Sequence, residues 1–172
     1  MRKSTKTIIA RRFIFIILFL IGNILQNTQG FFPEIFGIRA YFLISLTVCV
    51  GMFEREIAGA VFGLFAGALW DGVSGMGDGY NALFLMIIGA LCGLLINLLM
   101  RNNLVTALLL NFMAHIIYIT CYIIFFIIAE GVTDVTYLFL RYYLPSCIYS
   151  IIFTPIFYLL IRSIMNKTKV EE

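Results

Sequence analysis

Apolar residues in this chain occur in long unbroken runs rather than in a short alternating pattern. Six runs can be marked along the sequence: 13–27, 36–53, 57–70, 80–100, 104–129 and 137–161. A helix that crosses a bilayer needs about 20 apolar residues, whereas barrel strands alternate polar and apolar residues over about ten residues. The pattern therefore predicts an all-α fold, a polytopic transmembrane bundle of six helices that forms a single integral membrane domain over residues 1–172.

The third run is the shortest and the hardest to place across a membrane. As a helix, 57–70 would be about 21 Å long, against a hydrocarbon core of about 30 Å. The acidic and basic residues Glu54, Arg55 and Glu56 separate it from the second run and leave room only for a tight turn. The third helix must therefore be extended by Glu56 or Asp71, cross a thin region, or be partly re-entrant.

The amino-acid composition excludes several soluble classes of protein. Of the 172 residues, 62% are hydrophobic and only 12% are charged, about half the charged share of a soluble domain. This argues against a soluble enzyme, a secreted disulfide scaffold and a disordered tail. The four cysteines lie inside apolar runs without CxxC spacing, so we expect small core hydrophobes rather than disulfides or metal ligands. They are Cys49, Cys92, Cys121 and Cys147.

The positions of the basic residues predict the orientation in the membrane. If the N-terminus is cytoplasmic and all six runs cross, ten basic residues lie on the inner side and two, Arg39 and Arg141, on the outer side. The inner residues are Arg2, Lys3, Lys6, Arg11, Arg12, Arg55, Arg101, Arg162, Lys167 and Lys169. Because cytoplasmic loops carry an excess of Lys and Arg, we expect both termini in the cytoplasm. A basic patch beside apolar spans is a topology signal, so nucleic-acid binding is not expected.

Small residues repeat every four positions in the third run. Gly59, Gly63 and Gly67 share one helix face, and Asp71 continues the series. In lipid, such a face lets another backbone approach closely. It is therefore a candidate partner-binding face, with packing inside the protein's own bundle as the alternative. For Asp71 we consider an ion pair to Arg39 or Arg141, a partner contact, or proton or substrate chemistry.

A second set of small and polar residues is expected where two later helices meet. It comprises Gly89, Gly93 and Asn97 on run 80–100, and Ala107, Asn111 and His115 on run 104–129. Interhelical hydrogen bonding explains such residues, and a polar pocket or proton relay is the alternative. The sequence lacks HExxH, GxSxG and P-loop motifs and a buried carboxylate pair. No catalytic residue, cofactor or metal is therefore expected.

One stretch of about 25 residues resembles a known family. A glycine-spaced helix is followed by an aromatic residue and aspartate, a serine-glycine loop, and a glycine–tyrosine–asparagine–alanine–leucine start to the next helix. This arrangement is similar to the central motif of the rod-shape-determining protein MreD family. Its outer-loop residues are Trp70, Ser74, Gly75, Gly79 and Asn81, next to Asp71.

The resemblance implies a membrane scaffold without enzymatic activity. Members of that family act in bacterial cell elongation at the plasma membrane, with the bitopic protein MreC as partner. They connect MreB filaments with a peptidoglycan glycosyltransferase and its transpeptidase. The family is also similar in fold to the substrate-binding subunits of energy-coupling-factor transporters. A vitamin or small-molecule transporter subunit is therefore the alternative, with Asp71, Asn81, Tyr80 and Trp70 around an outward pocket.

Overall fold

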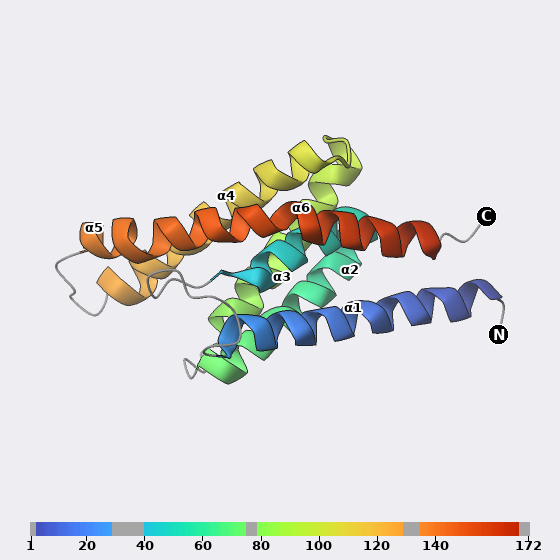
Figure 1. Cartoon of the computed structure of the whole chain (residues 1–172), viewed down its shortest axis with the longest axis horizontal. Coiled ribbons are helices and arrows are strands. Elements are labelled where there is room, and N and C mark those ends of the chain that lie inside the picture. Colours follow the sequence, from blue (N-terminus) through green and yellow to red (C-terminus); the bar gives the residue numbers. More distant parts are fainter. Residues whose placement is uncertain (1–2, 29–39, 75–78, 129–134, 169–172) are drawn as a thin grey trace.

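The computed structural model describes residues 3–28, 40–74, 79–128 and 135–168, and these ranges are helical almost throughout (Figure 1). The long helices are α1 (Lys3–Asn27), α2 (Phe42–Ser74), α3 (Tyr80–Leu98), α4 (Leu104–Tyr122) and α6 (Leu144–Lys167). Two π-helical turns, η1 (Ile123–Ile128) and η2 (Phe139–Tyr143), and the short α5 (Val135–Leu138) lie between α4 and α6.

Within the described ranges, five helices are long and apolar enough to cross a membrane, judged by length and composition. The predicted all-helical membrane fold is therefore confirmed, but the count of six helices is not. The difference arises in α2, a 33-residue helix that joins the predicted runs 36–53 and 57–70.

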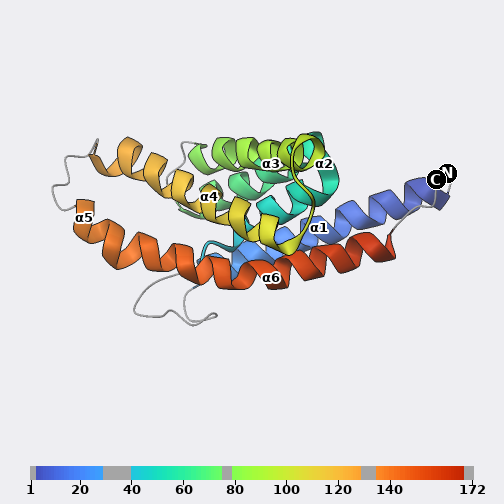
Figure 2. The ribbon, with the colours of Figure 1, turned by 90° about the horizontal axis from the view of Figure 1, so that it is seen from above.

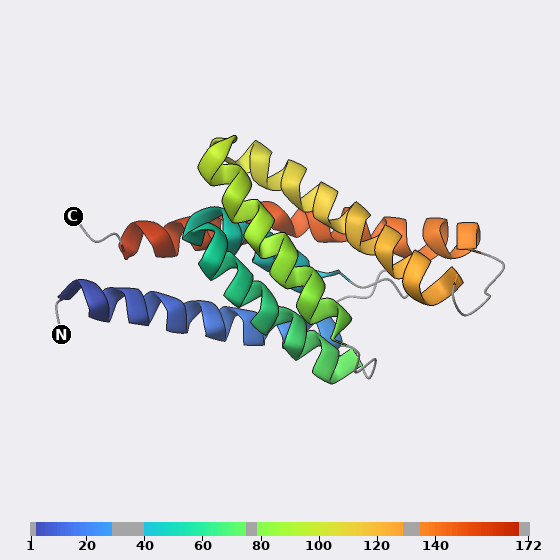
Figure 3. The ribbon, with the colours of Figure 1, turned by 180° about the vertical axis from the view of Figure 1, so that it is seen from behind.

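Helix α2 is broken at Arg55, where φ is 72° and ψ is 177°. A Cβ placed on Gly59 would lie 2.9 Å from the Cα of Gly51, although eight residues of straight helix span about 12 Å. The chain therefore folds back at Arg55 into a first arm (42–54) and a second arm (56–74), a reversal visible in Figure 3. The tight turn expected at Arg55 is present, and the second arm extends beyond 57–70 at both ends.

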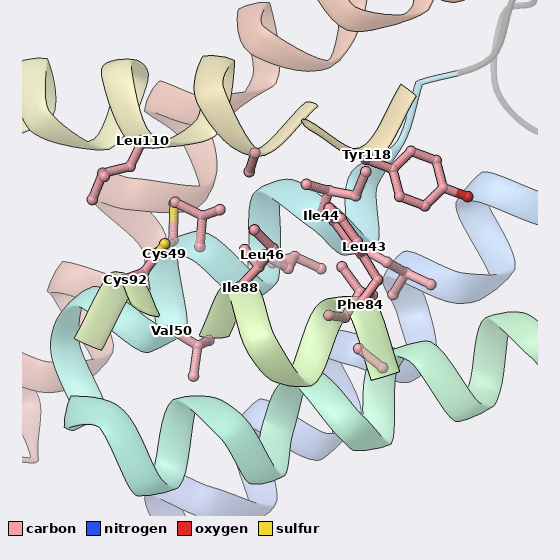
Figure 4. Packing of buried hydrophobic residues seen from close by; sticks show 14 of the residues in the cluster. Leu43, Ile44, Leu46, Cys49, Val50, Phe84, Ile88, Cys92, Leu110 and Tyr118 are labelled. Carbon is pink, nitrogen blue, oxygen red and sulfur yellow. The ribbon is translucent and has the colours of Figure 1, made fainter. Parts of the chain in front are cut away.

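The first arm of α2 forms the centre of the molecule. Its residues 42–52 are all buried, and α2 contacts α1, α3, α4 and α6. Figure 4 shows side chains of this arm packed against α3 and α4, and Figure 2 shows α3 on one side of it and α6 on the other. A helix that is apolar on every face belongs in such a surrounded position.

Helix α1 covers the second arm of α2 along one edge. The rings of Phe15 and Phe19 lie 5.7 and 5.9 Å from the ring of Phe62, and Arg11 Nε lies 2.5 Å from Glu54 Oε1 in an ion pair. The start of α1 and the end of α6 lie at the same end of the molecule (Figures 1 and 2).

Candidate functional site

The glycine face of α2 is packed against the backbone of α3. A Cβ on Gly63 would overlap the Leu85 carbonyl, and one on Gly67 would overlap the backbone of Asn81 and Ala82. Gly59 has the same relation to the carbonyl of Gly89. These positions need glycine because a side chain would collide with a neighbouring main chain rather than with a movable side chain.

This contact favours internal packing over partner binding for the face of Gly59, Gly63 and Gly67. Helix α3 occupies the face, so a partner helix could reach it only by displacing α3. The predicted meeting of Gly89 and Gly93 with α4 is also wrong. Both glycines face α2 instead, Gly89 at Gly59 and Gly93 at Glu56.

Asp71 caps the N-terminus of α3. Its Oδ1 accepts hydrogen bonds from the backbone N–H of Asn81 (3.2 Å) and from the Asn81 side-chain amide (2.9 Å), and its Oδ2 accepts from the N–H of Ala82 (2.9 Å). The first N–H groups of a helix have no partner within the helix, and the helix dipole favours a negative charge there. The carboxylate at the end of one helix thus fixes the start of the next.

Gly79 occupies the capping position of α3 with a φ of 71°, and the capping oxygens come from Asp71. Asp71 forms no ion pair with Arg141 within the described chain, and Arg39 and Gly75 lie outside the described residues. Ser74 donates a hydrogen bond to the Asp71 carbonyl at 3.3 Å.

Aromatic side chains surround this cap. Tyr118 donates a hydrogen bond to Asn81 Oδ1 at 2.8 Å, its ring stacks on Trp70 at 5.3 Å, and Tyr41 lies 5.5 Å from Trp70. A cavity of about 160 Å³ lies among Tyr41, Trp70, Ser74, Asn81, Tyr118, Tyr122 and Tyr143.

A polar seam joins the first arm of α2 to α4 and α6. The side-chain amide of Asn111 donates to Ser45 Oγ at 3.1 Å and to Thr154 Oγ1 at 2.5 Å. His115 is fully buried, and its Nδ1 donates to the Asn111 carbonyl at 2.8 Å. Asn97, expected beside Asn111, is exposed. Asn111 therefore links three helices through side chains that sequence reasoning had not paired with it.

The residues that complete the polar seam and the aromatic surroundings of the cap were not predicted from the sequence. On α6, Ser146, Ser150 and Thr154 are buried at four-residue spacing, a polar helix face that could have been noticed. Ser150 accepts a hydrogen bond from the Tyr41 N–H at 2.7 Å. No sequence pattern pairs Tyr118 with Asn81, because they lie on different helices 37 residues apart.

An apolar groove of about 580 Å³ lies between α3 and α4 on the surface of the bundle. It is lined by Gly79, Tyr80, Leu83, Phe84, Ile87, Ile88, Leu91, Ile117, Cys121, Phe125 and Phe126. In the described ranges, no group of three His, Cys, Asp or Glu side chains could hold a metal ion. All four cysteines are free, and Cys121 is the one that is only partly buried.

The fold and these contacts define a multi-pass helical membrane protein whose polar residues hold helices together. The chain matches the family described as rod shape-determining protein MreD over residues 6–168, and it belongs to that family. The resemblance found in the sequence is thus confirmed. The family is one of shape-determining membrane proteins and is not known for enzymatic activity.

No curated protein and no solved structure matches the chain. The similarity to substrate-binding subunits of energy-coupling-factor transporters is therefore not confirmed, and the comparisons do not support the transporter alternative.

Proposed function

We propose that this protein is a scaffold of the bacterial cell-elongation machinery that acts by binding an MreC-like bitopic partner in the plasma membrane. The match to the family over residues 6–168 is the observation that carries the proposal. The small extramembrane part of the chain supports the proposal, because the five apolar helices of the described ranges account for most of its length. Such a protein works through partners: the MreC-like protein and, through it, MreB-like filaments and the peptidoglycan glycosyltransferase–transpeptidase pair.

In this proposal both termini are cytoplasmic and the two arms of α2 enter the membrane separately. The reversal at Arg55 supports this topology, because the start of α1 and the end of α6 can then lie on the same side of the membrane. The second arm has roughly 19 residues, about 28 Å as a helix, close to the thickness of the hydrocarbon core. The predicted split of ten inner to two outer basic residues agrees with this topology under the positive-inside rule.

The apolar groove between α3 and α4 is the surface we propose for the partner's transmembrane helix. The glycine face of α2 is already covered, so it supports binding only indirectly, by holding α3 in place. The groove is open instead: Leu83 is 58% exposed, and Ile87, Leu91 and Phe125 are exposed along its walls. A single apolar helix laid between two helices would bury these side chains at the helical spacing at which they occur.

A bulky substitution in the groove tests this surface. We expect Leu83→Trp to reduce co-purification with the MreC-like partner about tenfold, equivalent to the loss of roughly 1.4 kcal/mol of binding free energy. The control is Leu159→Trp, because Leu159 is equally exposed (57%) but lies on α6. Equal recovery of the partner with both variants would reject the groove and leave the scaffold role intact.

Depletion of the protein tests the scaffold role itself. We expect rod-shaped cells to become round when the protein is depleted, with labelled peptidoglycan precursor no longer incorporated along the side wall. Microscopy with complementation by the wild-type chain measures both effects. Cells that keep their shape and their side-wall labelling during complete depletion would contradict the proposed role.

A further inference from the structure

A second cavity, of about 460 Å³, lies between α1 and the reversal of α2. Its walls are Arg12, Glu54, Arg55, Glu56, Ile57, Ala58, Val61 and Phe62. It combines charged side chains at the reversal with apolar side chains that lead away along the second arm. This combination is typical of the boundary between lipid headgroups and acyl chains, where charged and apolar groups meet.

The charged groups around this cavity are only partly neutralised by the protein. Glu54 is almost fully buried and forms the ion pair with Arg11. Arg12 and Arg55 are exposed, and neither forms an ion pair within the described chain. Glu56 also lines the cavity, and its Oε2 is buried without a hydrogen-bond partner among the described residues. Among the described residues, two guanidinium groups and one carboxylate are therefore left without a partner.

The backbone at the cavity is held in an unusual conformation. Arg55 is the single non-glycine residue with positive φ in the described chain. A bulky residue in this region is strained, and such strain persists where the surroundings impose it and is often found at binding sites. The reversal places the side chains of residues 54, 55 and 56 around one cavity, which a continuous helix would spread over different faces.

We propose that this cavity binds the headgroup of an aminophospholipid, a membrane lipid that carries a phosphodiester and a primary ammonium group. The phosphodiester accepts hydrogen bonds from Arg12 and Arg55, because a planar guanidinium matches phosphate oxygens. The ammonium donates to the carboxylate of Glu56. The acyl chains lie along Ile57 and Val61, whose side chains are 77% and 60% exposed.

The unpaired carboxylate distinguishes this lipid from its competitors. A glycerol headgroup has the phosphodiester but no cation for Glu56. A choline headgroup is cationic, but its three methyl groups leave no N–H to donate. The apolar rim favours a membrane lipid over a soluble phosphate compound, since exposed Ile57 and Val61 need a nonpolar partner.

Native mass spectrometry of the detergent-purified full chain tests the proposal. The probes are dioleoyl lipids with ethanolamine, glycerol or choline headgroups, added at equal concentration. We expect the ethanolamine lipid to be retained about tenfold more than the other two, as one hydrogen bond to a charged group predicts. Glu56→Gln should reduce its retention to that of the glycerol lipid, and Arg12→Gln should weaken retention of all three.

Arg162→Gln is the matched control, since Arg162 is an exposed arginine on α6 that does not line the cavity, and we expect it to leave retention unchanged. If Glu56→Gln aggregates, wild-type protein is titrated with ethanolamine headgroups carrying no, one, two or three N-methyl groups. Retention should fall as the N–H donors are lost. Equal retention across that series, or preference for the glycerol lipid, would overturn the proposal without bearing on cell shape.

Discussion

The two arms of α2 are held to their neighbours by different kinds of contact. The second arm packs backbone against backbone on α3 through Gly59, Gly63 and Gly67. The first arm is joined to α4 and α6 through side-chain hydrogen bonds centred on Asn111. Helix α2 therefore needs glycine where it contacts α3, and hydrogen-bonding side chains where it contacts α4 and α6.

This contrast shows two ways in which helices associate where hydrophobic burial between them contributes little. In lipid, association depends on close packing and on interhelical hydrogen bonds, and α2 uses close packing towards α3 and hydrogen bonds towards α4 and α6. Close packing tolerates few substitutions, because repulsion rises steeply when an atom is added against a rigid backbone. A hydrogen-bonded seam tolerates substitutions better, since each hydrogen bond contributes little stability by itself.

The largest expected effect is that of a side chain added to the glycine face. Gly63→Leu would place atoms into the Leu85 carbonyl, so α2 and α3 must separate. We expect a loss of about 3 kcal/mol or more in the free energy of unfolding, measured by SDS titration in mixed micelles. Gly72→Ala is the control, because a Cβ on Gly72 has no atom within 4 Å. Equal stability of the two variants would contradict the close contact.

An intermediate effect is expected at the cap of α3. Asp71→Ala removes the acceptor of three hydrogen bonds, and loss of a helix cap costs about 1–2 kcal/mol. Amide hydrogen exchange should accelerate at Asn81 and Ala82 more than in the middle of α3. Asp71→Asn, which keeps an acceptor oxygen, should restore part of the protection. Unchanged exchange at both amides in Asp71→Ala would show that the carboxylate does not cap the helix.

The smallest of these effects is expected in the polar seam. Asn111→Leu preserves the side-chain volume but removes the bonds to Ser45 and Thr154. At about 0.6 kcal/mol per hydrogen bond in lipid, we expect a loss of about 1 kcal/mol in the same titration. Asn97→Leu is the control, because Asn97 is exposed and should change stability little. A loss as large as that of Gly63→Leu would remove the contrast between the two kinds of contact.

Much of the fold and part of the site could be predicted from local pattern. Residues close together in the chain predict the helical runs and the turn at Arg55. They also predict that Trp70, Asp71 and Asn81 belong to one motif. The function of each motif residue could not be predicted in the same way. Asp71 looked like a candidate for an ion pair, because its hydrogen bonds to the start of α3 depend on how the intervening loop brings the helices together.

The helical secondary structure, the membrane location and the MreD family could all be recognised from the sequence. Runs of apolar residues and a local motif carry that information, because bilayer thickness and backbone hydrogen bonding act on each segment separately. Which helix faces meet depends on the tertiary structure. A glycine face has the same sequence whether α3 or a partner covers it, and the reversal at Arg55 determines that α3 does.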